Sequence, residues 1–225
     1  MTDYKNLELI ASSSPHIRAA ENTRSIMLDV IIAMLPALAY SVWAFGLRAL
    51  TVTCASVIFC VAWEWLYRRL MKQPQAVGDL SAVVTGILLA LVCPVGVTYF
   101  ALFVGSFFSI VVAKQLFGGI GKNFVNPALV GRAMMVASFA GNMTTWAKFQ
   151  ATSHLFGSNA DVVTGATPMA YLHANNVQGL LDSGVTMTDM FLGRIGGSLG
   201  EISALMLIAG GIYLLTRAVG LKKAA

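Results

Sequence analysis

The chain has 225 residues, of which 57% are hydrophobic and only 11% are charged, whereas soluble domains are about 45–50% apolar and about 25% charged. Its net charge of +5 does not indicate a nucleic-acid-binding protein, because the basic residues lie at the ends of apolar runs and not on one solvated face. Composition therefore argues against a water-soluble globule and predicts an all-α integral membrane protein surrounded by lipid.

The apolar runs predict six membrane-spanning helices. The first 25 residues are polar, and the first apolar run is too long for the core of a cleavable signal peptide. The predicted spans are 26–46, 49–67, 80–93, 97–116, 126–141 and 201–219. We therefore expect a polytopic helical bundle, with about five helices within 26–141 and a further one at 201–219.

The basic residues predict how these helices are oriented. If residues 1–25 are cytoplasmic, six crossings leave only Arg48, Lys148 and Arg194 outside, and the remainder of the 15 Lys and Arg residues lie inside. This asymmetry is the one that the positive-inside rule describes. Residues 142–200 are then external, and residues 220–225 form a cytoplasmic end.

Two of the predicted spans are short. Ser81–Cys93 and Pro127–Ala140 would each extend about 20 Å as helices, whereas the hydrocarbon core is about 30 Å thick. Asp79 and Asn126 are placed to act as their N-caps. Paired short or broken helices suggest an inverted repeat with a site near the middle of the membrane. The alternative is a pair of tilted or thinned spans with no special function.

Several polar or reactive side chains fall inside the apolar runs. Glu64, which lies between two tryptophans near a basic end, is interpreted as an interfacial residue that reaches toward the headgroups. Asp29 either does the same or faces an internal ion path. Cys54, Cys60 and Cys93 are too far apart in sequence to predict a metal or iron-sulfur site, and we interpret them as buried free thiols.

The region 142–200 is rich in Thr, Ser, Asn and Gly, and it contains the segment Asp161-Val162-Val163-Thr164-Gly165-Ala166-Thr167-Pro168. A purely structural reading makes this segment a turn, with Gly165 at positive φ. Thr167 would then be the N-cap of a helix that Pro168 opens. A functional reading makes the segment a site of covalent modification, and the two readings are compatible.

The chain resembles a known family, which comprises the membrane protein RnfD of Rnf complexes and the related NqrB of the sodium-pumping NADH:quinone oxidoreductase. The resemblance covers nearly the whole sequence. Its blocks are Ser14-Pro15-His16-Ile17-Arg18, Gly78-Asp79-Leu80-Ser81-Ala82, Val84-Thr85-Gly86, Lys114-Gln115-Leu116-Phe117-Gly118-Gly119, Asn126-Pro127-Ala128, Met143-Thr144-Thr145-Trp146, Thr164 to Pro168, and Gly193 to Gly200 with Glu201-Ile202-Ser203-Ala204.

This resemblance implies that Thr167 carries FMN through a phosphoester, attached by a dedicated flavin transferase. Thr164 belongs to the motif but is not the acceptor, and Asp161 begins the segment. A threonine hydroxyl is a weak nucleophile that needs such a catalyst, and Gly165 with Ala166 leaves it accessible. The family also implies a second, non-covalent flavin such as riboflavin.

The surroundings of the flavin are less well defined by sequence. Arg194 and the glycine-rich stretch 193–200, leading into a helix at Glu201, are candidates for phosphate contact. Alternatively Ser198 and Glu201 form a capping box and the glycines allow close helix packing. The aromatic side chains that could stack on the flavin or form an interfacial belt are Trp146, Phe149 and Tyr171.

The resemblance implies a component of an ion-translocating ferredoxin:NAD oxidoreductase in the bacterial cytoplasmic membrane, with its flavin on the periplasmic side. Its partners would be other membrane and peripheral subunits of the same complex, with Na⁺ or H⁺ as the coupling ion. A relative of the quinone-reducing NqrB, a solute transporter without a redox role, and a scaffolding protein with an unmodified motif are the alternatives. Family members continue through further helices beyond the position of Arg217, so we expect the family's C-terminal helices to be absent from this chain.

Overall fold

The computed structural model describes residues 22–147, 167–174, 178–179 and 184–224, with side chains as far as Arg217 in the last helix. Within these residues the chain is helical and contains no strand, as the composition predicts. The elements are α1 (Thr23–Phe45), α2 (Leu47–Leu70), η2 (Val77–Asp79), α3 (Ser81–Leu91), α4 (Tyr99–Phe107), η3 (Phe108–Gln115), α5 (Pro127–Ser138), α6 (Ala140–Met143), α7 (Pro168–His173), α9 (Met187–Leu192) and α10 (Ala204–Ala224).

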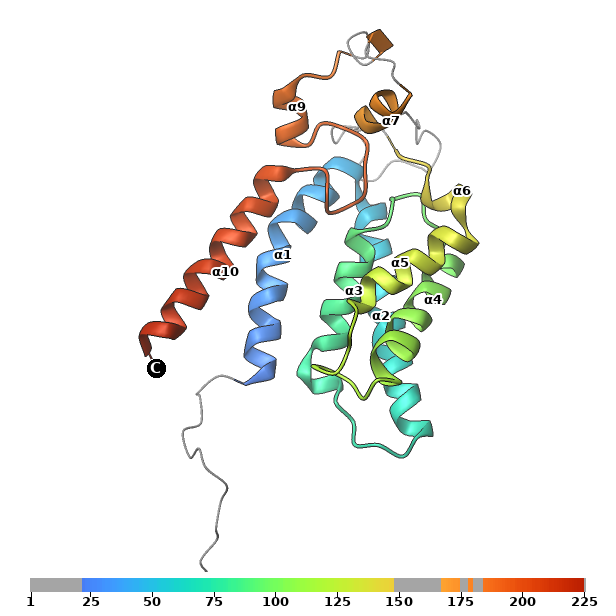
Figure 1. Cartoon of the computed structure of the whole chain (residues 1–225), viewed down its shortest axis with the longest axis vertical. Coiled ribbons are helices and arrows are strands. Elements are labelled where there is room, and N and C mark those ends of the chain that lie inside the picture. The colour runs from blue at the N-terminus through green and yellow to red at the C-terminus, as the bar shows by residue number, and fades with distance from the viewer. Residues whose placement is uncertain (1–21, 148–166, 175–177, 180–183, 225) are drawn as a thin grey trace, which may run out of the picture.

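The helices are arranged as a bundle with a paired outer layer (Figure 1). Helices α2 to α5 pack together, with α3 against α2 as the most extensive contact, while α10 packs along α1. The short helices α7 and α9 lie at one end of the bundle, and the start of α1 and the end of α10 lie at the other (Figure 1).

Two helices are long and apolar enough to cross a membrane, α1 with 23 residues and α2 with 24. At about 1.5 Å per residue, both exceed the roughly 30 Å of the hydrocarbon core. The other apolar helices of the described residues are shorter: Ser81–Leu91, Tyr99–Gln115 and Ala204–Arg217. The expected positions of the helices are thus confirmed, and a bundle with six crossings stays a prediction.

The two short helices form where the sequence predicts them. Asn126 caps α5, since its side-chain oxygen accepts the amide of Ala128 at 3.0 Å. At α3 the prediction is off by one residue, because Leu80 occupies the N-cap position with φ 64°. Asp79 still acts there, because its Oδ1 accepts the amide of Ser81 at 2.9 Å. The inverted repeat stays a prediction.

Helix α3 lies close to α2 because a glycine faces the α2 backbone. A Cβ on Gly86 would come within 2.7 Å of the Cα of Val57. The hydroxyl of Ser56 donates to the carbonyl of Gly86 at 2.7 Å. Small residues let helix backbones approach in this way, and the resulting contact fixes α3 as the centre of the bundle.

Helix α4 does not continue as a regular α-helix. From Phe108 to Gln115 it widens into η3, which is a π-helix of eight residues. Such segments are rare and are frequent at functional sites. Lys114 and Gln115, at the end of η3, both contact the same buried carboxylate on α2.

Candidate functional site

Thr167 lies at the start of α7, in the position that the sequence predicts. Its backbone is extended, with φ −75° and ψ 156°, and its Oγ1 accepts the amide of Ala170 at 3.3 Å. Pro168 is the first residue of the helix, so the predicted N-cap is confirmed. The side chain is half-buried. Asp161, Thr164, Gly165 and Ala166 lie outside the described residues.

Arg194 lies beside α9 and pairs with Asp189, with 3.9 Å between Nη1 and Oδ1. Asp189 also accepts the hydroxyl and the amide of Thr186, which form a capping box at the start of α9. The Thr186 hydroxyl, the Thr186 amide and the Arg194 charge, in that order, hold the pKa of Asp189 below its usual value of 3.8. Among the described residues Arg194 therefore pairs with α9 and not with Thr167.

Residues 193–203, which we call the inserted loop, pass from α9 back into the bundle before α10 begins. The amide of Leu199 donates to the carbonyl of Cys93 at 3.0 Å, and the amide of Gly200 donates to that of Leu91 at 2.7 Å. The Ser41 hydroxyl of α1 donates to the Leu199 carbonyl. The loop thus satisfies carbonyls at the end of α3 that the helix leaves without partners.

The inserted loop corrects the predicted start of the last helix. The helix begins at Ala204, so Glu201 is not in its first turn. Ser198 donates its hydroxyl to the Glu201 carboxylate at 2.5 Å, which replaces the predicted capping box. The glycines do allow close packing, since a Cβ on Gly200 would come within 2.7 Å of the Leu91 Cβ. The amides of Leu199 and Gly200 are used on α3, which removes them from phosphate contact.

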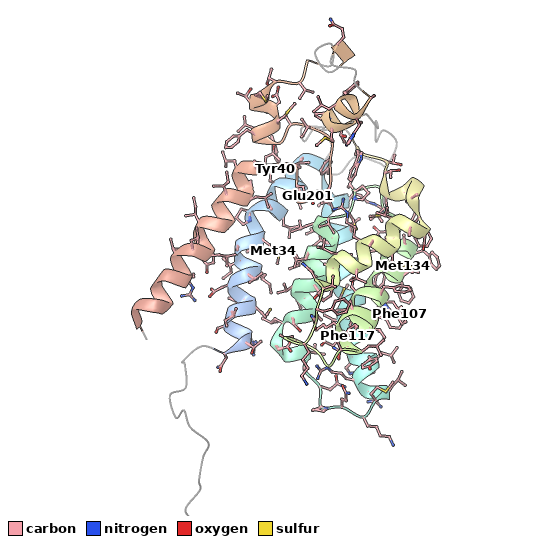
Figure 2. The ribbon with its side chains drawn as sticks, viewed as in Figure 1. Met34, Tyr40, Phe107, Phe117, Met134 and Glu201 are labelled. Carbon is pink, nitrogen blue, oxygen red and sulfur yellow. The ribbon has the colours of Figure 1, made fainter. Side chains whose placement is uncertain are left out.

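An ion pair fastens the inserted loop to α5. Arg132 Nη1 lies 3.5 Å from Glu201 Oε1, and both side chains are partly exposed. Figure 2 shows Glu201 at the level of Tyr40, near the end of α1 where the inserted loop lies. The orientation predicted from sequence places Arg132 among the cytoplasmic cations, whereas it lies within α5, paired with a residue of this loop.

The most deeply buried charges of the described residues meet between α2, α3 and η3. Glu64 is 0% exposed, and Lys114 is 2% exposed. Lys114 Nζ lies 3.0 and 3.1 Å from the two carboxylate oxygens of Glu64. The interpretation of Glu64 as an interfacial side chain is wrong: its carboxylate points into the bundle, where a lysine that the predicted orientation places in the cytoplasm neutralises it.

Further polar groups surround this pair. Gln115 Nε2 donates to Glu64 Oε1 at 2.6 Å, and Arg68 Nε lies 3.7 Å from the same oxygen. Lys114 Nζ also donates to the Ser81 hydroxyl at 2.5 Å. That hydroxyl in turn donates to Asp79 Oδ1 at 2.7 Å. We call Glu64, Lys114, Ser81, Asp79, Gln115 and Arg68 the buried ionic cluster.

Asp29 forms a second buried pair, between α1 and α10. Its carboxylate is 3.0 Å from Arg217 Nη2 and accepts the Tyr213 hydroxyl at 3.0 Å. Of the two alternatives left open by sequence, a reach toward headgroups does not hold, because Asp29 is 7% exposed and faces α10. The partner could not be identified from sequence, since it lies 188 residues away.

The remaining candidates are distributed over the described part of the chain. Cys60 and Cys93 are buried as expected, but Cys54 is exposed on α2, so its predicted burial is wrong. Trp146 and Tyr171 are half-buried, and Phe149 lies outside the described residues. Within the described residues no group of His, Cys, Asp and Glu could hold a metal ion.

These features define a class of protein: an all-α chain with apolar helices, a capped threonine at one end and a buried ionic cluster. The chain belongs to the NQR2, RnfD, RnfE family, which it matches over residues 10–222.

Its relatives include RnfD proteins of complexes with stated ion specificities. It is 47% identical over 215 residues to the RnfD protein of the Na⁺-translocating ferredoxin:NAD⁺ oxidoreductase complex of Acetobacterium woodii, covering 95% of this chain and 64% of the relative. It is 38% identical over 215 residues to the proton-translocating counterpart of Clostridium ljungdahlii, covering 94% of this chain and 63% of the relative. The counterpart in Stutzerimonas stutzeri, named as part of an ion-translocating oxidoreductase complex, is 36% identical over 213 residues, with coverages of 84% and 59%. The chain therefore spans a little under two thirds of the length of these relatives.

Proposed function

We propose that this chain is the flavin-carrying membrane component of an Rnf-type, ion-translocating ferredoxin:NAD oxidoreductase, with FMN joined to Thr167 by a phosphoester. The names of the relatives support an Rnf-type complex over the quinone-reducing branch of the family. Electron transfer and ion transport would belong to the assembled complex, whose other membrane and peripheral subunits are its partners.

The observation that carries the proposal is the position of Thr167 in the family's motif at the start of α7. Its side chain is not fully buried, so a flavin transferase can reach the hydroxyl. The cap accepts a hydrogen bond from Ala170 through Oγ1, and an ester oxygen keeps lone pairs that can still accept it. The residues present therefore fit a phosphoester at this threonine.

When bound, the flavin supplies one-electron and two-electron redox chemistry, and the protein supplies position and electrostatics. Thr167 holds the group at a fixed place on the end of the bundle that carries α7 and α9. A tether of this kind raises the effective concentration of the carrier near its redox partners. The inserted loop, anchored by Glu201 on α5 and by Gly200 on α3, supports the region from which the tether extends.

In this proposal the helices cross the bacterial cytoplasmic membrane, and the end that carries α7 and α9 faces the periplasm. The positive-inside bias supports that orientation, since Arg68, Arg69 and Lys72 cluster at the opposite end of α2. The short helices α3 and α5 support an inverted repeat around the middle of the membrane. A second, non-covalent flavin is proposed from the family resemblance alone.

The test is in-gel flavin fluorescence after denaturation, with the chain co-expressed with the flavin transferase. The unchanged chain is expected to fluoresce, and Thr167→Ala is expected to remove the signal. Thr164→Ala is the matched control, since it alters the other motif threonine and should keep the signal if the transferase tolerates it. Mass spectrometry of the peptide spanning residues 161–168 locates the added mass. A signal that persists in Thr167→Ala would refute the assignment of this residue.

A further inference from the structure

An unbroken line of hydrogen bonds leads from the centre of the bundle toward the loop between α2 and α3. It begins at the Glu64 carboxylate and passes through Lys114 Nζ, 3.0 Å away. It continues to the Ser81 hydroxyl at 2.5 Å and to Asp79 Oδ1 at 2.7 Å. Glu64, Lys114 and Ser81 are buried, whereas Asp79 is half-buried and lies in η2. The line therefore joins a fully buried carboxylate to one that water reaches.

Every group in this line can carry a proton, and each faces the next with the correct donor and acceptor. A lysine ammonium has three donors and no acceptor, whereas a hydroxyl both donates and accepts. Ser81 accepts from Lys114 and donates to Asp79. The relay runs across three elements, α2, η3 and the start of α3, and the π-helical end of η3 brings Lys114 to it.

Neighbouring groups hold the relay in place without interrupting it. The Ser81 amide donates to the same Asp79 oxygen at 2.9 Å, which fixes that carboxylate. Gln115 donates to Glu64 at 2.6 Å. Arg68 on α2 faces Glu64, while its Nη1 donates to the Pro74 carbonyl at 2.8 Å. Cys60 also lies near both Lys114 and Glu64. Arg68 and Lys114 together offset the charges of Glu64 and Asp79.

We propose that Glu64, Lys114, Ser81 and Asp79 form a proton-transfer line that exchanges protons between the interior of the bundle and the α2–α3 loop. A proton on Lys114 Nζ moves to the Ser81 oxygen as the Ser81 hydroxyl proton moves to Asp79, so one N–H and one O–H bond break and two O–H bonds form. Neutral Lys114 then takes a proton from protonated Glu64. The net change is Glu64-COOH plus Asp79-COO⁻ to Glu64-COO⁻ plus Asp79-COOH, and rotation of the Ser81 hydroxyl resets the line.

This inference rests on the proposed function in one respect, that the complex moves ions when electrons flow. The names of the two relatives divide between Na⁺ and protons. A line of proton-carrying side chains with an ammonium at its centre suits protons, because Lys114 already occupies the position next to Glu64 that a metal cation would take.

The experiment uses sealed membrane vesicles that contain the complete complex, driven by its electron donor and acceptor. Proton movement is followed with a pH-sensitive dye, and Na⁺ movement is followed with radioactive sodium in the same vesicles. Ser81→Ala removes the relay hydroxyl. Asp79→Asn keeps the Oδ1 acceptor that holds the Ser81 amide but takes up no proton. Ser81→Thr restores the hydroxyl, and Ser106→Ala removes a buried hydroxyl that bonds only within its own helix at Phe103.

Proton carriers positioned in reaction paths typically contribute about 10²–10⁴-fold, so we expect Ser81→Ala and Asp79→Asn to slow proton movement at least about tenfold. Ser81→Thr and Ser106→Ala should stay near the unchanged complex. Unchanged proton rates in Ser81→Ala and Asp79→Asn would overturn the line, and so would Na⁺ uptake that persists when a protonophore removes all net proton movement. Flavin fluorescence of the same samples separates the two proposals: its absence from the unchanged complex rejects the covalent flavin, whereas its presence with unaffected proton rates rejects the line alone.

Discussion

Arg217 Nη2 lies 3.0 Å from Asp29 Oδ2 and joins the last described helix to the first. Arg217 Nε also donates to Asp29 Oδ1 at 3.1 Å, and Tyr213 adds a hydroxyl to the same oxygen. Helix α10 packs mainly along α1, with a smaller contact to α9. This pair therefore holds the end of α10 that is far from the inserted loop.

Asp29→Asn and Arg217→Gln are each expected to lower the thermal midpoint of the detergent-solubilised chain by a few degrees. Each change leaves a charge without its partner in a mostly buried position, which costs more than removing both charges. The double variant should therefore lose less than the sum of the single losses. Differential scanning fluorimetry measures the three midpoints, and Arg24→Gln, at the exposed start of α1, is the control. Strictly additive losses would show that the two side chains do not stabilise each other.

Gly86→Ala tests the contact between α3 and α2. The added Cβ meets backbone atoms of Val57 at 2.7 and 3.0 Å, which cannot move as a side chain can. Overpacking of this kind costs about 1–3 kcal/mol, and each kcal/mol corresponds to about 2–4 °C for a chain of this size. Gly78→Ala is the matched control, because nothing lies within 4 Å of its Cβ. Equal midpoints for the two variants would contradict the close approach of α2 and α3.

Helix positions are the part of the fold that sequence predicts best. The long apolar runs and local caps such as Asn126 determine where helices start, and both signals are contained in neighbouring residues. The start of α10 is missed because residues 201–203 are apolar or polar in the right pattern, yet their backbone is used by the inserted loop. A contact between distant segments, such as that of Gly200 with Leu91, leaves no periodic signal in the sequence.

The candidate site divides in the same way. Thr167 is identified because its motif is contiguous, and the Thr167 cap follows from the Pro168 that succeeds it. Glu64 is misinterpreted because Trp63, Trp65 and the following arginines are typical of an interface. Its partner Lys114 is 50 residues away, and the π-helix that brings the two together has no simple sequence pattern. The combination of Glu64 and Lys114 inside apolar runs is the signal that could have paired them.

The start of α9 is expected to loosen in acid. The folded pKa of Asp189 is lowered from 3.8 by the Thr186 hydroxyl, the Thr186 amide and Arg194. A lowered folded pKa contributes stability that is complete above the unfolded value and is lost as the pH falls through the folded value. Amide hydrogen exchange over residues 186–192, corrected for the intrinsic pH dependence, should therefore stay slow from pH 7 to about pH 4 and accelerate below it. Asp189→Asn should remove this pH dependence, and its persistence in that variant would assign the transition to another group.

Thiol labelling tests the seal that the inserted loop makes on α3. Cys54 is exposed, whereas Cys60 and Cys93 are buried, and the Cys93 carbonyl accepts the Leu199 amide at 3.0 Å. A membrane-permeant maleimide should label Cys54 alone in the native chain. Gly200→Val should displace the loop, because a Cβ at this position already comes within 2.7 Å of the Leu91 Cβ. Labelling at Cys93 is then expected to rise at least about tenfold, which corresponds to about 1.4 kcal/mol in the opening of the loop.

Two internal controls accompany this labelling experiment. Cys60 lies in α2, away from the loop, and it should stay unlabelled in Gly200→Val, which distinguishes local opening from general unfolding. Gly141→Ala adds a Cβ that meets nothing within 4 Å, and it should leave the labelling pattern unchanged. If Cys93 stays protected in Gly200→Val while the variant remains folded, the inserted loop is not what shields it. If Cys93 and Cys60 become reactive together, the loop supports the whole bundle, because the contacts of α3 with α2 are then lost along with the seal.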